Sequence, residues 1–328
     1  MEKPGDGDKL TVPLLEPKPA TRKHQEDDAE QEEEEVASVR RRLVEENKKL
    51  WVVAGPSICA RFSSFGVTVI SQAFIGHIGA TELAAYALVS TVLMRFSNGI
   101  LGNHTVSELW YNTILVLLTG YMKNAEVALD ALSICLNING WEMMISIGFL
   151  SAIGVRVANE LGAGSARRAK FAIFNVVTTS FLIGFALFVL FLFFRGRLAY
   201  IFTENKAVAN EVADLTPLLA FSILLNSVQP VLSGVAIGSG WQSVVAYVNI
   251  TSYYLIGIPL GAILGYVLGF QAKGIWIGML LGTLVQTLVL LFITLRTDWK
   301  KQVEITRERL NRWYMDENGR SRNSIGNP

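Results

Sequence analysis

The sequence predicts an all-α polytopic membrane protein. Two observations support this fold class: 51% of the 328 residues are hydrophobic, and apolar stretches follow one another from Leu109 to Trp299 with only short polar breaks. Residues 170–194, 243–268 and 274–295 are each long enough to cross a bilayer, which takes ~20 predominantly apolar residues. Residues 50–295 carry only 20 charged side chains. The membrane is therefore the expected solvent for most of the chain.

The first 49 residues form a polar tail. They hold 10 basic and 14 acidic side chains and few aromatic ones, a composition that predicts a disordered segment. Basic residues at 40–42 and 48–49 stand directly before the first apolar stretch. By the positive-inside rule, they place this N-terminal tail in the cytoplasm.

About eight transmembrane helices are expected. They run at about 51–76, 82–101, 107–122, 129–155, 168–195, 212–237, 243–268 and 273–295, the third being short. An even number returns the C-terminal tail, residues 298–328, to the cytoplasm, and its basic residues agree. The basic loop within 156–170 faces the same side, whereas the acidic loop 203–214 faces the other. The charge pattern thus predicts an integral, multi-pass protein with both termini cytoplasmic.

One carboxylate stands near the middle of a predicted span. Glu142 lies in the segment Asn-Ile-Asn-Gly-Trp-Glu that begins at Asn137. A charge in hydrocarbon costs at least ~2.5–3.5 kcal/mol on insertion scales, so such a residue is a functional candidate. Two interpretations stay open: Glu142 binds a proton or faces a substrate, or it belongs to a structural hydrogen-bond network between helices.

A second carboxylate, Glu108, opens the short third span beside Trp110 and Tyr111. A carboxylate next to aromatic faces suits recognition of organic cations or flat aromatic compounds. The alternative is that Glu108 lies at the membrane–water interface within a belt of aromatic side chains. On this interpretation it has no role in binding a ligand.

The sixth span combines amides with a helix-breaking residue. Asn226 and Gln229 are three positions apart and therefore share one helix face. Pro230 removes a backbone hydrogen bond and can kink the helix. These residues favour a helix that bends while it lines a polar cavity. The alternative is close helix packing through the neighbouring small residues.

Several other chemistries lack a signal. Cys59 and Cys135 form no CxxC or Cys/His cluster, so no metal site is expected. The glycines around 234–240 lack the lysine of a P-loop, no catalytic constellation indicates an enzyme, and nothing indicates a nucleic-acid partner. A transporter with no ATP site and no other cofactor would run on an ion gradient.

Short segments across the membrane part carry a more specific signal. They are 72–79 (QAFIGHIG), 82–85 (ELAA), 109–111 (LWY), 137–142 (NINGWE), 156–162 (RVANELG), 230–236 (PVLSGVA), 257–261 (GIPLG), 273–276 (KGIW) and 296–299 (RTDW). On these segments the chain resembles plant multidrug and toxic compound extrusion (MATE) transporters of the DETOXIFICATION group, over about residues 48–301.

The resemblance implies a MATE-like helical bundle that is internally shortened. The family has twelve spans in two six-helix lobes, whereas this chain matches the first two and then, near residues 101–107, the seventh. Spans three to six are missing, as in a splice variant or a mis-predicted gene model. The implied organisation is an N-lobe remnant at 50–101, a deletion joint at 102–107 and a C-lobe at 108–297.

The resemblance also implies site residues. Glu108 matches a carboxylate of the seventh span that is implicated in proton coupling, and Asn226 stands where the tenth span has an acidic residue. Coupling would then rest on Glu108, assisted by Glu142. The remaining residues expected in the substrate cavity are Trp110, Tyr111, Asn137, Gln229 and Pro230.

The resemblance leaves two functions open. The first is proton-coupled antiport of organic compounds, namely xenobiotics or flavonoid-type metabolites, across the vacuolar or plasma membrane. The second is a transport-inactive isoform, or a regulatory subunit associated with a full-length relative. The expected partners are thus a small organic substrate, the lipid bilayer and, in the second case, that relative.

Overall fold

The computed structural model describes residues 19–78, 118, 125–195 and 197–325, and every regular element in them is helical. The membrane part consists of α5 (Ala125–Gly162), α6 (Ala166–Phe193), the 3₁₀ turn η2 (Leu198–Ile201), α7 (Lys206–Gly238), α8 (Gln242–Ile250), η3 (Thr251–Gly257), α9 (Ile258–Ala262), η4 (Ile263–Val267) and α10 (Gln271–Arg296). In the sequence, helix α1 (Pro19–Ile78) precedes this part and helix α11 (Trp299–Ile325) follows it.

Six helical stretches in the described residues are long and apolar enough to cross a membrane. They are Ala37–Ser71, Val127–Gly162, Ala166–Phe193, Lys206–Gly238, Gln242–Val267 and Gln271–Arg296. They correspond to the predicted first, fourth, fifth, sixth, seventh and eighth spans. The predicted second and third spans lie outside the described residues, and with them Glu108, Trp110 and Tyr111.

The N-terminal segment differs from the disordered tail expected from composition. Helix α1 begins at Pro19, a residue whose fixed φ suits the first helical position, and continues through the charged segment into the first span. Its Glu, Lys, Arg and Ala residues are strong helix formers, so high charge does not prevent helix formation here. The chain divides into a unit up to Glu46 and a unit from Asn47 onward, and every contact described below lies within the second.

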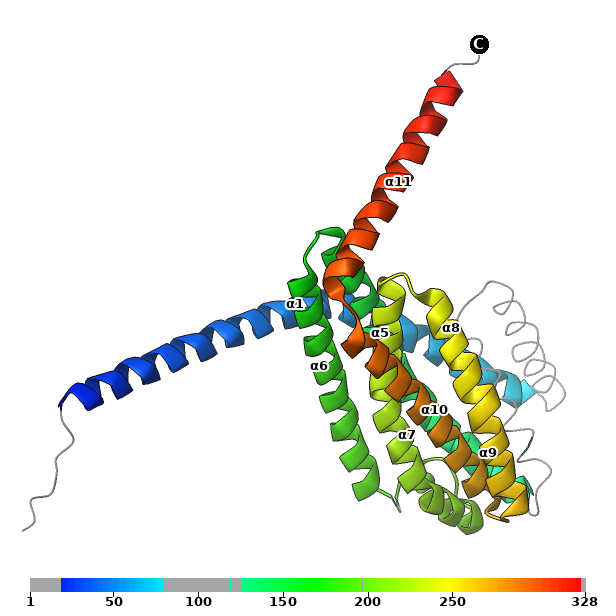
Figure 1. Cartoon of the computed structure of the whole chain (residues 1–328). Helices are drawn as coiled ribbons and strands as arrows, with labels where there is room; N and C mark the ends of the chain where they lie inside the picture. Colours follow the sequence, from blue (N-terminus) through cyan, green and yellow to red (C-terminus); the bar gives the residue numbers. More distant parts are fainter. Residues whose placement is uncertain (1–18, 79–117, 119–124, 196, 326–328) are drawn as a thin grey trace, which may run out of the picture. The chain divides into compact units, whose positions relative to one another are not determined.

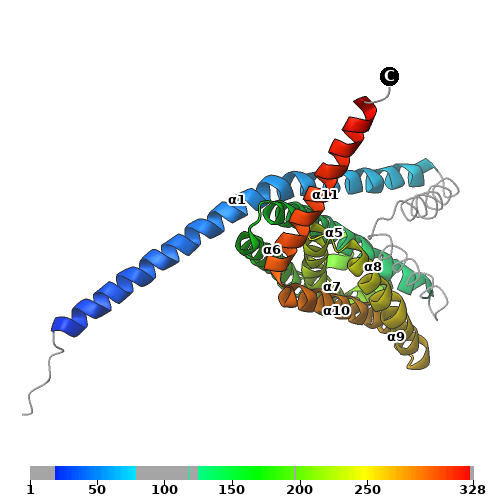
Figure 2. The same cartoon turned by 45° about the horizontal axis from the view of Figure 1, so that its top comes forward.

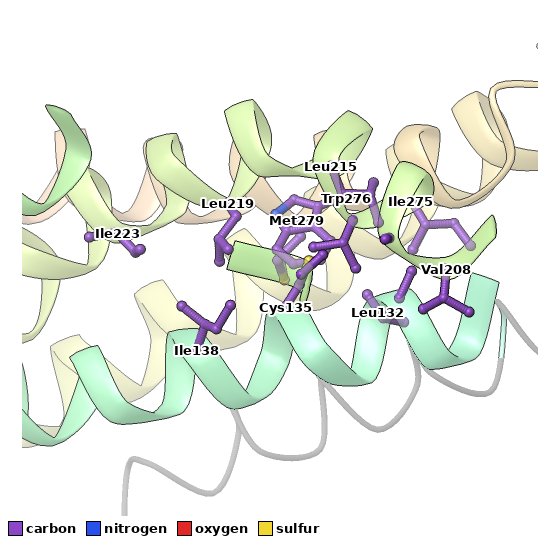
Figure 3. Packing of buried hydrophobic residues seen from close by; sticks show 14 of the residues in the cluster. Leu132, Cys135, Ile138, Val208, Leu215, Leu219, Ile223, Ile275, Trp276 and Met279 are labelled. Atoms are coloured by element: carbon purple, nitrogen blue, oxygen red, sulfur yellow. The ribbon is translucent and has the colours of Figure 1, made fainter. Parts of the chain in front are cut away.

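Helix α7 is the central element of the bundle. It packs against α5, α6 and α10 (Figure 1 and Figure 2). One apolar cluster joins α5, α7 and α10, with side chains gathered around the buried Trp276 (Figure 3). The indole Nε1 of Trp276 donates to Ser222 Oγ of α7 at 2.8 Å. The largest buried ring of the core is therefore also anchored by a hydrogen bond.

Glycines set the close approach of α5 and α7. A Cβ added at Gly234 would lie 2.5 Å from the carbonyl oxygen of Leu150, and one at Gly238 would lie 2.5 Å from that of Gly154. Residues with rising numbers in α5 thus meet residues with rising numbers in α7, so the two helices run in the same direction. This is the small-residue packing that membrane helices use to bring backbones together.

The first span packs along α5 in the opposite direction. The ring of Trp51 lies 5.6 Å from that of Phe149, while Phe65 lies 4.8 Å from Trp141. Gly140 faces the Phe65 ring. The first span is therefore seated on the C-terminal bundle through edge-on aromatic contacts.

The seventh span is not a uniform α-helix. Two π-helical segments, η3 and η4, flank the five-residue α9, which contains Pro259. Pro259 lacks an N–H and π turns commonly accompany such interruptions of the α-helical ladder. Next to them, Gly261 and Gly278 bring the backbones of α9 and α10 into contact. The apolar pattern predicts the span correctly but not this irregular geometry.

Candidate functional site

The polar residues predicted inside the spans meet along the contact of α5 with α7, which we call the α5–α7 seam. Asn226 Nδ2 of α7 donates to Asn139 Oδ1 of α5 at 3.0 Å, and both side chains are buried. An amide pair in hydrocarbon satisfies groups that would otherwise lack a partner, which favours one register of the two helices. The seam therefore contains a buried hydrogen bond between two amides in addition to its glycine contacts.

Glu142 lies one turn beyond Asn139 on the face of α5 that packs on α7. Its side chain is only 5% exposed, and its Oε1 accepts a 2.7 Å hydrogen bond from Ser146 Oγ. A neighbouring hydroxyl can donate to the carboxylate or accept from the carboxylic acid. The arrangement is therefore compatible with both protonation states of Glu142.

Gln229 and Pro230 continue the polar stretch on α7, and both are buried. Gln229 Nε2 donates to Ser233 Oγ at 3.3 Å, while Gln229 Oε1 has no hydrogen-bond partner among the described residues. Pro230 cannot donate to the carbonyl of Asn226, yet α7 continues as an α-helix through it. Asn226 thus presents two polar groups at one level of the seam. One is its side-chain amide, and the other is its backbone carbonyl, which Pro230 leaves without the usual helical donor.

Asn137 does not join this group. Its side chain is exposed, and its Nδ2 donates to the carbonyl of Ser133 in the preceding turn at 3.2 Å. Since it lies two residues before Asn139, it occupies nearly the opposite face of α5. The structure therefore brings together Glu142, Asn226, Gln229 and Pro230, and not Asn137.

A second buried amide pair was missed from the sequence. Gln286 Nε2 of α10 donates to Asn249 Oδ1 of α8 at 2.5 Å, and Gln286 is 0% exposed. The signal was present, because both amides stand inside predicted spans. Neither has a carboxylate or a proline beside it in the sequence.

Ion pairs mark one end of the bundle. Glu160, near the end of α5, lies 3.0 Å from Arg156 Nη2 and 2.9 Å from Arg168 Nε. Arg168 belongs to the first turn of α6, so Glu160 ties the two helices together across their short turn. Acidic and basic side chains are thus paired around the turn between α5 and α6, where the basic loop was predicted.

The opposite end carries a second cluster. Asp214 of α7 pairs with Lys273 at 2.8 Å and lies 3.6 Å from Arg195. Pro217 offers no N–H to the carbonyl of Ala213, and Arg195 Nε donates to that carbonyl at 2.7 Å instead. The acidic loop of the predicted topology is therefore compensated by Arg195, which follows α6, and by Lys273 of α10.

In the part of the chain that the structure describes, no group of three or more His, Cys, Asp or Glu side chains is arranged to hold a metal ion. The polar chemistry of the seam is instead one carboxylate, several amides and hydroxyls. Such groups bind protons, water and neutral or cationic organic groups by hydrogen bonding.

Comparison with known proteins gives consistent relatives. The MatE family model matches residues 101–263. Protein DETOXIFICATION 21 of Arabidopsis thaliana is 39% identical over 448 residues, covering 83% of this chain and 91% of that protein. Protein DETOXIFICATION 39 of the same plant is 52% identical over 206 residues, covering 63% of this chain and 41% of that protein.

Two solved structures share the fold. The crystal structure of the eukaryotic MATE transporter AtDTX14 matches with a TM-score of 0.60 at 32% identity, covering 70% of this chain and 55% of that chain. An outward-facing multidrug resistance MATE family transporter of the MOP superfamily has a TM-score of 0.52 at 16% identity, covering 69% and 48%. The chain thus spans about half the length of these transporters.

The chain is shorter than the part of DETOXIFICATION 21 with which it aligns. The aligned 83% of this 328-residue chain is about 272 residues, so about 176 of the 448 aligned positions have no counterpart in it. Despite this, the alignment reaches across 91% of the relative. The chain, an integral multi-pass membrane protein, therefore belongs to the MATE family, whose members are secondary transporters rather than enzymes.

Proposed function

We propose that this chain moves small organic compounds across a membrane by antiport with protons. The substrates would be xenobiotics or flavonoid-type metabolites, exported across the plasma membrane or sequestered in the vacuole, with both termini in the cytoplasm. The names and folds of the relatives support efflux of multidrug type. The proton, the substrate class and the membrane are our inference.

The observation that carries the proposal is the buried carboxylate of the α5–α7 seam. Glu142 lies within a membrane-length helix, beside a hydroxyl donor and one turn from an amide pair. A carboxylate at this depth is stabilised by protonation or by a cationic partner. A site that exchanges a proton for an organic cation or polar compound requires this property.

Asn226 and Gln229 support a substrate role for the same seam. Their amides can donate and accept, and α7 loses a backbone hydrogen bond at Pro230 beside them. We infer that opening of the seam exposes these amides to the substrate, with Trp110 and Tyr111 contributing aromatic faces. Because Asn226 does not titrate, Glu108 and Glu142 would carry the proton.

The test is uptake into proteoliposomes with an imposed pH gradient, using a fluorescent organic cation and a flavonoid glycoside. Glu142→Gln keeps the size of the side chain and an oxygen that can accept from Ser146, but it cannot titrate. Asp130→Asn on the exposed part of the same helix is the matched control. We expect Glu142→Gln to lower gradient-driven uptake at least tenfold, with Asp130→Asn unchanged. Equal uptake by both variants would remove Glu142 from coupling.

Glu108→Gln tests the other proposed proton site in the same assay. A loss in Glu108→Gln alone would assign coupling to the residue that the family resemblance indicates. A loss in both variants would indicate two carboxylates that share the task. Uptake that responds to a Na⁺ gradient and not to pH would contradict the choice of proton.

A second candidate function has its own observation. Since about 176 aligned positions of DETOXIFICATION 21 have no counterpart here, most of the N-terminal lobe would be absent if the gap falls at 102–107. The first span is seated directly on α5, so this face of α5 is already covered within the chain. This favours a transport-inactive isoform that associates with a full-length relative.

Co-expression separates the two functions. The chain is purified with and without a tagged full-length DETOXIFICATION protein, and uptake is measured for each preparation. Gradient-driven uptake by the chain alone would contradict the inactive isoform. Absence of uptake, together with stoichiometric co-purification and altered uptake by the partner, would contradict independent transport.

A further inference from the structure

A cavity of about 390 Å³ lies away from the α5–α7 seam, at the end of the bundle where α6 begins and α10 ends. Its walls are mainly apolar and come from α6, α7, α10 and the first residue of α11. Phe174 of α6 and Leu295 of α10 line it and are 66% and 75% exposed. The cavity therefore borders the outer, lipid-facing surface of the bundle.

Aromatic residues indicate the level of this cavity in the membrane. Trp299, which closes one wall, is buried, and its ring lies 6.1 Å from that of Trp241. Tryptophans concentrate at the boundary between hydrocarbon and headgroups. The apolar walls of the cavity thus reach into the hydrocarbon, while the end near Trp299 lies at headgroup level.

The charge around this end is basic. Lys170 lines the cavity directly, and Arg167, Lys300 and Lys301 are exposed in the adjoining turns of α6 and α11. The acidic residue beside them, Asp298, accepts from the backbone N–H groups of Lys300 and Lys301 at 3.0 and 3.4 Å. It therefore serves as a helix cap.

Glu160 at this end is also occupied, because both of its carboxylate oxygens are paired with arginines, and Glu304 stands one turn beyond Lys300 and Lys301 on α11. Lys170, by contrast, forms no ion pair with any residue that the structure describes, so the charge that lines the cavity is positive. It matches an anionic group at headgroup level, while the apolar walls match a hydrocarbon chain.

We propose that this cavity binds an anionic phospholipid, with one acyl chain between α6 and α10 and the phosphate beside Lys170. A volume near 390 Å³ is at the small end of the range for ligand pockets, which suits part of one chain. A zwitterionic lipid would fill the same walls but would gain less from Lys170. In the predicted topology this end faces the cytoplasmic leaflet, where anionic lipids are concentrated.

The test is native mass spectrometry of the purified full chain with equal amounts of phosphatidylglycerol and phosphatidylcholine. We expect phosphatidylglycerol adducts to dominate. Lys170→Gln should lower the ratio of the two adducts about fivefold, as expected for loss of one basic residue near an anionic lipid surface. Lys206→Gln, an exposed lysine at the other end of the bundle, is the matched control and should leave the ratio unchanged.

A second variant tests the acyl-chain site. Thr178→Phe places a ring in the cavity and should reduce adducts of both lipids, whereas Val189→Phe on the exposed surface of the same helix should not. Millimolar inorganic phosphate should displace neither lipid. Equal adducts of the two lipids, equal effects of Lys170→Gln and Lys206→Gln, or displacement by phosphate would each overturn the proposal.

Discussion

Helices α6 and α7 are neighbours of similar length, yet the more apolar of the two, α6, is the less buried. In its most apolar 18-residue stretch, α6 has a mean hydropathy of 2.5 and only 17% of its residues are buried, whereas the values for α7 are 1.6 and 72%. In a water-soluble protein the more apolar helix would be the inner one. Here lipid replaces water, so the less apolar helix is central and carries the polar residues that distinguish the site.

The inward stripe of α6 sharpens this contrast. Seven residues of α6 are buried, and most are small or medium in size: Ala169, Ala172, Asn175, Val176, Ser180 and Gly184, together with the larger Ile173. Its large side chains, such as Phe185 and Phe193, are exposed. Size, rather than hydrophobicity, therefore decides which face of a membrane helix packs against protein.

The largest expected effect comes from a bulky residue at the closest contact of α7. Gly234→Leu would drive the side chain into the Leu150 carbonyl and should destabilise the fold by about 3 kcal/mol, or prevent folding. Ala186→Leu on the exposed face of α6 adds similar bulk and should be neutral. Thermal unfolding in detergent measures both. A normal melting temperature for Gly234→Leu would show that the α5–α7 seam is loosely packed.

Removal of the amide pair in the α5–α7 seam should have a smaller effect on stability. Asn226→Leu leaves Asn139 without its donor and should cost about 1–2 kcal/mol. Asn139→Leu with Asn226→Leu should recover part of that loss, with a coupling of about 0.6 kcal/mol. The double-mutant cycle is measured by unfolding in sodium dodecyl sulfate. Strict additivity would show that the amide pair is not coupled.

The smallest effect is expected from one hydroxyl at the contact of α6 with α7. Ser180 Oγ donates to the carbonyl of Ser227 at 2.5 Å. Ser180→Ala should cost about 0.6 kcal/mol, while Val189→Ala on the lipid-facing side should cost less, because it leaves no cavity within protein. If the order is reversed, the outer surface of α6 is covered by another protein rather than by lipid.

The sequence predicted the six spans in the described residues well, because charged residues set their boundaries. Helix α6 was expected at 168–195 and occupies Ala166–Phe193, between the basic turn around Arg168 and Arg195. The spacing of three also predicted that Asn226 and Gln229 share one helix face, and in the structure both are buried. By contrast, apolar periodicity does not record helix type, so the π segments of the seventh span were not foreseen.

The site was predicted less completely than the spans. Asn137 and Asn139 are equally polar in the sequence, and only the packing of α5 against α7 decides which of them faces inward. The pairing of Asn249 with Gln286 depends on the crossing of α8 and α10. Contacts between residues so far apart in the chain have no local signal.

The two π segments of the seventh span have a consequence for the surrounding bilayer. The stretches Gln242–Val267 and Gln271–Arg296 have 26 residues each, but a π turn, with its i→i+5 bonds, holds more residues per turn than an α turn. We therefore expect the seventh span to be shorter along its axis than α10, although their residue counts are equal. Lipids beside it would meet a lower hydrophobic wall and respond by local thinning. One flank of this transporter would thus impose its own membrane thickness.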